Sequence, residues 1–363
     1  MTEIRPFVAG DLPGVARLFL EAFPSPLART PEGVAAEFRR IYLEHPWSDS
    51  GVPSILAERD GDVIGFIGAI PMPMRLGGHP VRVAVGGNLM ASPTASDPMA
   101  TIRMLRTFFA GPQDLTLTDT ASLEATKLWT GLGGRVCRFG SMRWVAPLRP
   151  AAMAMALGFR NHPVLRRVGG LVAAPVDAIA QGARRRGRPD GRSGSLRHID
   201  ADELLHELGR RKPSRTLGFD GDPAAFRWLV DNVARKRQFG PLRPLAFDGD
   251  DGVRRGAALY YPNHGDLGQV LCITVEPGWE QPLLDALFAD ARAQGSVALS
   301  GQVDPALFDQ LGGRSVLHWN QHVHLTVHAK DRSLVEPIVA GDIGVSRLFA
   351  DWWTPMQGDD LVD

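Results

Sequence analysis

The sequence has little of what marks several classes of protein. Its two cysteines, Cys137 and Cys272, lie far apart in apolar runs, which argues against a disulfide framework and a thiolate metal site. Forty basic residues balance forty acidic ones, so no overall field attracts nucleic acid. No apolar stretch reaches the roughly 20 residues that span a bilayer, and residues 1–10 fit neither a signal nor a transit peptide. We therefore expect a cytoplasmic protein with no nucleic-acid partner.

What the sequence does have is length and an internal repeat. At 363 residues it exceeds a comfortable single core, so two domains are expected. The hydrophobic periodicity predicts the order β-α-α-β-β-β-α-β-α-β-β between Ile4 and Val145, and the same order can be read between Leu196 and Val327. The expected parts are a first domain at 1–149, an insert or linker at 150–194, a second domain at 195–330 and a C-terminal extension at 331–363.

The segment between the two copies has two interpretations. Residues 150–194 are apolar for most of their length and end in a basic run from Arg184 to Arg188. The segment is either an amphipathic hairpin with a basic edge or a helical linker with a solvated arginine tail. The hairpin would rest peripherally on an anionic inner membrane surface or guide a hydrophobic substrate. Charge runs are usually solvated, which favours the linker.

A candidate phosphate-binding turn follows the predicted strand Val81 to Met90. Residues 91–101 supply a proline, a loop of small residues and a helix start. The first turn of a helix offers unpaired N–H groups and a favourable dipole to an anion. We expect the amides between Thr94 and Thr101 to form a nest for a diphosphate. If the segment were extended, capped by its own side chains or blocked by the neighbouring copy, an enzymatic function that depends on this nest would fail. Asp97 puts a carboxylate near the same place.

A second motif lies on the next predicted helix, with small polar, apolar, aromatic and glycine positions at Ser122, Ala125, Leu128, Trp129 and Gly133. Together with the element order and the turn at 91–101, it resembles the GCN5-related N-acetyltransferase (GNAT) superfamily. In that superfamily the two motifs hold the diphosphate and the pantetheine arm of coenzyme A. The resemblance covers the first copy, and the second copy looks like a degenerate member.

The resemblance implies an α/β (α+β) fold of two tandem domains with mixed, mainly antiparallel sheets. It also implies acyl-coenzyme A as a co-substrate, with no tightly bound cofactor, on the first copy, because the loop Glu276 to Trp279 of the second is too short to wrap a diphosphate. Trp129 stands where some members have a tyrosine that acts as a general acid. An indole N–H cannot usefully transfer a proton. For Trp129, packing in the core is as well supported as contact with the co-substrate. The residues placed against the co-substrate are Leu89, Met90, Ala91, Ser96, Met99, Ala100, Thr101 and Trp129.

Amide formation from a thioester needs a deprotonated amine and a backbone donor for the developing oxyanion. The resemblance implies that the thioester lies where the fourth and fifth strands part, beside Asn88, and Gly86-Gly87 mark a position for a bulge. Asp119 is the expected acceptor of the amine proton, with a cap for the following helix as its alternative role. His45 is a second candidate base.

Three histidines near the end of the second copy invite a metal hypothesis. His318, His322 and His324 have the same strand parity and are expected to face the same way. Alternating residues on one strand do not complete a tetrahedral site, so we expect polar lining of a groove and no metal.

The sequence favours an N-acyltransferase that moves an acyl group from acyl-coenzyme A to a primary amine. A long fatty acyl chain or a lipid-like amine such as a sphingoid base is suggested by the apolar insert and the methionines, in the general character of bacterial ceramide-forming members; core filling is the alternative. A Fem-like aminoacyl transferase is disfavoured by the balanced charge. A catalytically inert binding or regulatory module is the other alternative. It is supported by the absence of two features of the superfamily, the glycines of its phosphate-binding loop and the tyrosine at the position of Trp129. The methionines are Met72, Met74, Met90, Met99 and Met104.

Overall fold

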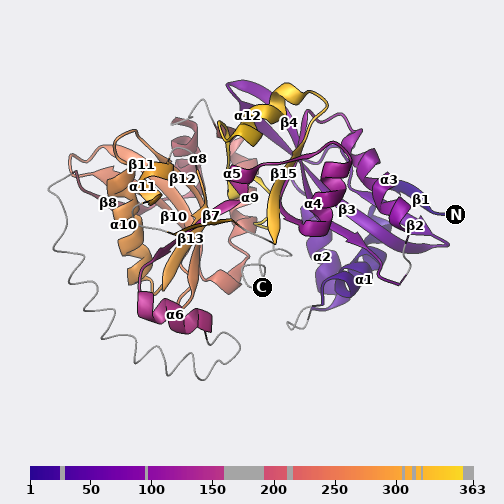
Figure 1. The fold of residues 1–363 in the computed structure, drawn as a ribbon, viewed down its shortest axis with the longest axis horizontal. Coiled ribbons are helices and arrows are strands. Elements are labelled where there is room, and N and C mark those ends of the chain that lie inside the picture. Colours follow the sequence, from indigo (N-terminus) through magenta and orange to yellow (C-terminus); the bar gives the residue numbers. More distant parts are fainter. Residues whose placement is uncertain are drawn as a thin grey trace. The chain divides into compact units, whose positions relative to one another are not determined.

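The structure is a computed structural model that describes residues 1–24, 29–94, 97–158, 192–210, 216–304, 307–312, 316–319 and 322–354. The chain divides into two compact units, each with a sheet and helices of its own (Figure 1). Unit 1 comprises Met1–Ser141, Ser214–Asn232 and Asn320–Asp363, and unit 2 comprises Met142–Pro213 and Val233–Trp319. Both units are therefore discontinuous in sequence.

Within the described residues, the sheet of unit 1 has nine strands in the order β1-β2-β3-β4-β5-β15-β6, with β9 beside β3 and β16 beside β9. The neighbours are antiparallel except β4 with β5 and β9 with β16, which are parallel. The strands are β1 (Glu3–Pro6), β2 (Ile55–Arg59), β3 (Asp62–Leu76), β4 (His79–Ala91), β5 (Leu115–Ser122), β6 (Arg135–Val136), β9 (Thr216–Phe219), β15 (Val323–His328) and β16 (Gly344–Val345).

The helices of unit 1 begin where the sequence offers caps. Thr30 accepts a hydrogen bond from the Gly33 amide at the start of α2, as its hydroxyl and the following proline predict. Ser122 does the same for the Ala125 amide at the start of α4. The helices are α1 (Leu12–Ala22), α2 (Pro31–Tyr42), α3 (Pro98–Phe109), α4 (Leu123–Gly131), α5 (Arg138–Ser141), α12 (Arg332–Ala340) and the 3-10 turns η1 (Ala9–Asp11) and η4 (Arg347–Phe349). Helix α9 (Pro223–Val233) spans the boundary between the units.

Different helices pack against the two faces of β3, because successive side chains of a strand point to opposite sides. Phe66 packs edge-on against Phe38 and Tyr42 of α2, with ring centroids 5.4 and 5.5 Å apart. Ile67 belongs to the core cluster that contains Met104 of α3 and Trp129 of α4. The sheet of unit 1 is therefore covered on both faces.

Gly68 lies on the α2 face, where there is no space for a side chain. A Cβ there would lie 2.2 Å from the Tyr42 ring, which is only 5% exposed. We expect Gly68→Ala to lower the free energy of unfolding by about 3 kcal/mol, measured by urea denaturation, because overpacking against a fixed ring is costly. Gly131→Ala in α4, where a Cβ would meet nothing within 4 Å, is the matched control and should be neutral or stabilising. An unchanged midpoint for Gly68→Ala would contradict this packing.

The sheet of unit 2 has, in the described part of the chain, seven strands in the order β14-β7-β13-β12-β11-β10-β8, and β12 with β13 is its parallel pair. Its strands are β7 (Met142–Pro147), β8 (Gly194–His198), β10 (Arg243–Gly249), β11 (Arg254–Tyr261), β12 (Leu267–Val275), β13 (Ala298–Gln302) and β14 (Val316–Trp319). Its helices are α6 (Pro150–Gly158), α8 (Ala201–Arg210), α10 (Glu280–Ala293), α11 (Phe308–Gly312) and the 3-10 turn η2 (Arg237–Phe239).

The last strands of the two expected domains are exchanged between the sheets. Strand β7, expected to close the domain at 1–149, pairs with β13 and β14 in unit 2. Strand β15, expected to close the domain at 195–330, pairs with β5 and β6 in unit 1, where its yellow arrow lies among earlier elements in Figure 1. The compact units thus differ from the expected division, although the element order within each copy is close to the one expected.

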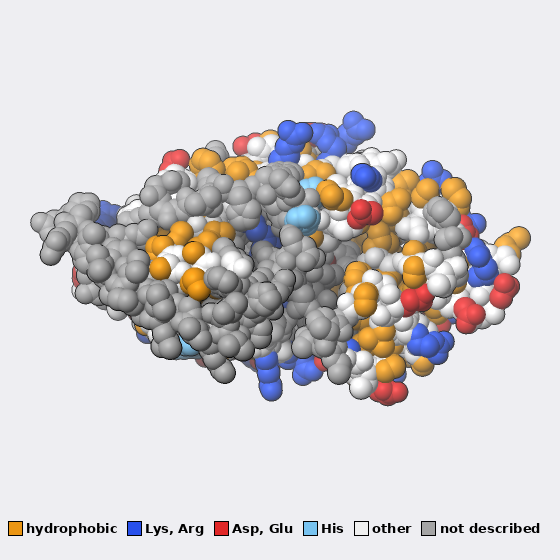
Figure 2. Space-filling view, turned by 60° about the horizontal axis from the view of Figure 1, so that its bottom comes forward, with side chains coloured by type: hydrophobic (Ala, Val, Ile, Leu, Met, Phe, Trp, Pro, Cys, Tyr) orange, Lys and Arg blue, Asp and Glu red, His pale blue; other side chains and the backbone are white. Residues whose placement is uncertain are grey.

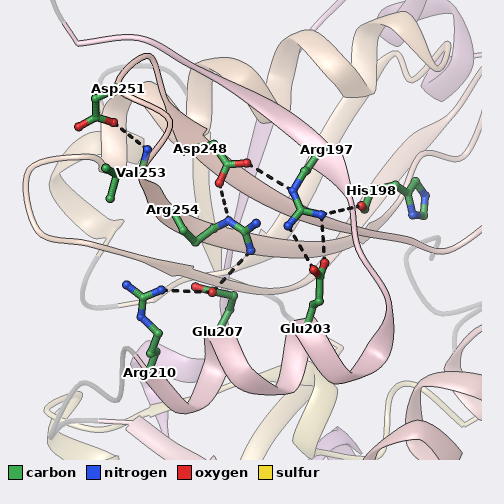
Figure 3. Close-up of polar contacts among 9 residues, drawn as sticks. All are labelled: Arg197, His198, Glu203, Glu207, Arg210, Asp248, Asp251, Val253 and Arg254. Carbon is green, nitrogen blue, oxygen red and sulfur yellow. Dashed lines mark hydrogen bonds and ion pairs between the residues drawn. The ribbon is translucent and has the colours of Figure 1, made fainter.

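One group of charged side chains recurs in both units. In unit 2, Arg197 of β8 binds Glu203, six residues later, and Asp248 of β10 (Figure 3). In unit 1, Arg5 of β1 binds Asp11, also six residues later, and Glu58 of β2. Asp11 precedes α1 but does not cap it with its side chain; its carboxylate accepts hydrogen bonds from Arg5 and from the Val8 amide. Two copies of one fold would produce this recurrence.

The insert is described only in part. Helix α6 covers Pro150–Gly158, and residues 159–191, which carry most of the apolar and basic pattern, lie outside the described residues. None of the described helices is long and apolar enough to cross a membrane. On the face shown in Figure 2, side chains of both charges are interspersed with hydrophobic ones over the described surface.

Candidate functional site

Strands β4 and β5 part after a short stretch of pairing. Their parallel register covers three pairs, the last of which is Val85 with Leu117. Beyond this pair β4 continues to Ala91 and β5 continues to Ser122. The sheet of unit 1 therefore opens at this point, where the resemblance placed a thioester.

A β-bulge lies on β4 at the same opening. Gly68 pairs with Gly87 and Phe66 with Met90, so Asn88 and Leu89 together face one residue of β3. Asn88 has a φ of 50°, in the left-handed region that asparagine tolerates better than most residues. The bulge was expected at Gly86-Gly87 and is found directly after them. An extra residue of this kind leaves an amide outside the ladder and free for another acceptor.

A residue of α2 holds the side chain of Asn88 in place. The Tyr42 hydroxyl donates a 2.6 Å hydrogen bond to Asn88 Oδ1. Burial, followed by the charge of Asp351, raises the pKa of Tyr42 well above its usual value, so it stays a neutral donor. This bond holds the bulge in one conformation.

Asp351, from the expected C-terminal extension, lies beside the opening. Its Oδ1 accepts 2.8 Å hydrogen bonds from the Thr118 hydroxyl and the Asp119 amide, and its Oδ2 accepts one from the Thr120 hydroxyl. A Cβ added at Gly87 of β4 would lie 3.6 Å from the Asp351 Cβ. The carboxylate therefore stands close to both diverging strands, and the sequence interpretation did not find it.

Asp119 ties this C-terminal segment to β5. Its Oδ1 accepts hydrogen bonds from the amides of Asp351 and Trp352, at 3.1 and 3.0 Å. The Arg347 Nε lies 3.9 Å from Asp119 Oδ2, and its guanidinium stacks 4.4 Å from the Trp352 ring centroid. The alternative role of Asp119 as a helix cap is not observed, since Ser122 caps α4.

The environment of Asp351 makes its carboxylate more basic than that of an ordinary aspartate. The side chain is 0% exposed, and burial, with the neighbouring Asp119 carboxylate as the second cause, raises its pKa well above the usual value. Thr120, its hydroxyl partner on β5, is half-buried rather than buried. Of the two hydroxyl groups that donate to Asp351, the one of Thr120 thus belongs to the more accessible residue.

Asp97 occupies the expected phosphate-binding turn. It is the N-cap of α3, and its Oδ1 accepts a 3.1 Å hydrogen bond from the Ala100 amide. Its Oδ2 accepts from the Thr2 hydroxyl, Arg59 and Arg103 at 2.9, 3.0 and 3.4 Å, and the Thr2 bond is the largest cause of its lowered pKa. The segment is thus capped by its own side chain, which is the arrangement that counts against a diphosphate nest.

The other expected co-substrate residues differ in accessibility. Trp129 is 1% exposed and packs edge-on against Phe109 at 4.9 Å, so its observed role is core packing. Met99 is 55% exposed at the start of α3. Met90, Ala100 and Thr101 are buried, Leu89 is half-buried, Ala91 is exposed, and Ser96 lies outside the described residues. Asn88, Leu89 and Met90 share the bulged stretch of β4.

The histidines do not line one strand. His318 belongs to β14 in unit 2, whereas His324 belongs to β15 in unit 1, so the expected shared face is wrong. His324 is buried, and its Nδ1 lies 3.3 Å from the Thr126 hydroxyl. The described residues contain no group of three His, Cys, Asp or Glu side chains that could hold a metal ion.

No family model matches the sequence, and no curated protein is similar to it in sequence. Solved structures are similar in fold. A GCN5-related N-acetyltransferase from Anabaena variabilis is 11% identical, with a TM-score of 0.59 over 91% of this chain and 73% of that one. A GCN5-related N-acetyltransferase from Kribbella flavida is 13% identical, with a TM-score of 0.55 over 91% of this chain and 71% of that one. The mixed α/β architecture with two mixed sheets is therefore the fold of GCN5-related N-acetyltransferases.

Proposed function

We propose that the protein is an N-acyltransferase that moves an acyl group from acyl-coenzyme A to a primary amine, with the reaction at the opening between β4 and β5. The observation that carries the proposal is the parting of these strands after Val85 and Leu117 beside a bulge at Asn88. A thioester carbonyl placed there would accept a hydrogen bond from an amide that the bulge frees, and such a donor stabilises the developing oxyanion.

The proton of the amine would pass to Asp351. An amine nitrogen beside Thr120 Oγ1 gives its proton to that hydroxyl while the hydroxyl gives its own to Asp351 Oδ2. A carboxylate with a raised pKa is a better base near neutral pH than an ordinary one. The nitrogen, which enters as an ammonium ion and is now a neutral amine, bonds to the acyl carbon and the C–S bond breaks. The nitrogen loses its second proton as it becomes an amide, and the departing coenzyme A thiolate takes that proton up through solvent. Asp119 positions Asp351 in this scheme rather than accepting the proton itself.

The diphosphate of coenzyme A would lie near the start of α3 in spite of Asp97. Pro98 has no N–H and the Ala100 amide is capped, which leaves the Met99 amide of the first turn for an anion. Arg59 and Arg103 both pair with Asp97, while the Glu21 carboxylate accepts hydrogen bonds from the Ser92 and Thr94 hydroxyls of the same turn. These two guanidinium groups supply most of the attraction in this proposal.

Substitution of Asp97 tests the co-substrate site. Asp97→Asn keeps an equally good helix cap and removes one negative charge. We expect the Kd of acetyl-coenzyme A, measured by calorimetry, to fall by about 3- to 10-fold in the variant, because a negative charge beside the diphosphate is removed. The matched control is Asp331→Asn at the cap of α12, which should leave the Kd unchanged.

A catalytically inert binding module with the same fold is the second candidate, and the capping of α3 by Asp97 favours it. The two candidates differ in one assay. Thiol release from acetyl- and palmitoyl-coenzyme A in the presence of simple primary amines and a sphingoid base supports the enzyme. Silence of the wild type and of Asp97→Asn toward both thioesters, in binding as well as in turnover, would instead support the inert module.

The proposal includes a long acyl chain and a lipid-like amine as substrates, and the only remaining support for them is the apolar sequence of the insert at 150–194. Four of the five methionines are at most 2% exposed and fill the core of unit 1, so they supply no argument for a lipid site. A preference for palmitoyl- over acetyl-coenzyme A, and binding to anionic vesicles that is lost on deletion of residues 159–191, are the results that would support it.

A further inference from the structure

Unit 2 contains a buried arginine without a counter-ion. Arg143 on β7 is 4% exposed, and its Nη1 is buried without a hydrogen-bond partner. No carboxylate of the described residues pairs with it. Removing a guanidinium from water without a partner is among the costliest arrangements in a protein interior, so some compensation is expected.

Other arginines of the same unit show what is missing. Arg243 forms two hydrogen bonds with Asp290, at 3.0 and 2.9 Å. Arg254 pairs with Asp248 and Glu207 (Figure 3). Among the residues that the structure describes, none provides such a counter-ion to Arg143.

A second unpaired donor lies close to Arg143 on the same face of the sheet. Arg143 pairs with Gln302 of β13 in the register, and Val145, two residues along β7, pairs with Ser300. Residues two apart on a strand share a face, so Ser300 and Arg143 are diagonal neighbours. Ser300 is 1% exposed, and its hydroxyl also has no partner.

The opposite face is apolar and already occupied. Trp144, between Arg143 and Val145, packs against Phe288 of α10 with ring centroids 6.1 Å apart. The pairing of β12 with β13 ends at Val270 and Gly301, directly after Ser300, so the strands separate beside the two donors. The polar pair therefore lies near the end of β13, where its pairing with β12 stops.

From this arrangement we infer that Arg143 and Ser300 form a binding site for the acid group of a small molecule, either a carboxylate or a phosphate. The planar guanidinium binds two oxygens of such a group at once, and the serine hydroxyl supplies a third hydrogen bond. The inference concerns unit 2 and does not depend on acyl transfer in unit 1.

The test measures thermal unfolding of the full chain in succinate, in phosphate and in chloride of equal ionic strength. We expect succinate or phosphate to raise the Tm of the wild type above its value in chloride, and the anion that acts identifies the acid group. Arg143→Met should abolish this rise, Ser300→Ala should reduce it, and Arg143→Lys should keep part of it. Arg243→Met, which removes a paired arginine, should lower the Tm but keep the rise.

The basal Tm in chloride gives an independent reading. Because Arg143→Met removes an uncompensated charge, its Tm should equal or exceed that of the wild type, in contrast to Arg243→Met. The inference is overturned if neither anion raises the wild-type Tm, or if Arg143→Met and the wild type respond equally.

Discussion

Asp351→Asn should lower kcat by a factor of about 10² to 10⁴ while leaving the KM for acyl-coenzyme A nearly unchanged, because a general base acts in the transition state and not in binding. Asparagine fits the same space. Its oxygen can still accept from the Thr118 hydroxyl and the Asp119 amide, and its NH₂ can donate to Thr120 Oγ1. The rate of coenzyme A release, with the amine that the wild type accepts, is the measurement.

Variants of two threonines distinguish a role of Asp351 in proton transfer from a purely structural role. Thr118 and Thr120 both donate to Asp351, but Thr118 is 6% exposed and Thr120 is half-buried. Thr120→Val should therefore reduce kcat strongly, and Thr118→Val should reduce it little. Equal losses in the two variants, or near wild-type activity in Asp351→Asn, would assign the cluster a purely structural role.

Local sequence patterns predicted local structure well. The cap Thr30 with Pro31 placed the start of α2, and the period of its apolar residues gave the buried face that carries Phe38 and Tyr42. These features depend on neighbours within one or two turns of the chain. For the same reason the carboxylate of Asp97 could be identified in advance as a problem for anion binding, and the structure shows it at the helix start.

Pairings between distant segments could not be predicted in this way. Strands β7 and β15 have the same alternating pattern whichever sheet they join, so their sequences do not state that they are exchanged. Asp351 lies 232 residues from Asp119, and no spacing rule connects them. The one available signal was an acidic residue directly before the two tryptophans Trp352 and Trp353, a composition typical of a buried segment.

Stability should fall below pH 6.5 because of His45. The side chain is 4% exposed beside Trp47 and Trp228, with ring centroids 6.1 and 6.3 Å away, and its Nδ1 is buried without a partner. Burial lowers the pKa of His45 to about 4. At neutral pH it is therefore uncharged, and it is a weaker base than an ordinary histidine for the reaction proposed above.

The sign follows from proton binding in the two states. Between pH 6.5 and about 4 the unfolded chain holds a proton on His45 that the folded chain excludes, so the free energy of unfolding decreases as the pH falls. The loss from this residue amounts to about 3 kcal/mol at pH 4 and is absent above pH 7. Urea denaturation at pH 7.5, 6.5, 5.5 and 4.5 measures it against His45→Phe, which keeps an aromatic ring and cannot titrate. The other ionisable groups are the same in both proteins, so the difference between the two curves isolates His45. Parallel curves would place its ring in water rather than among the tryptophans, whereas a wild-type curve that falls away below pH 6.5 ties the acid sensitivity of unit 1 to this one imidazole.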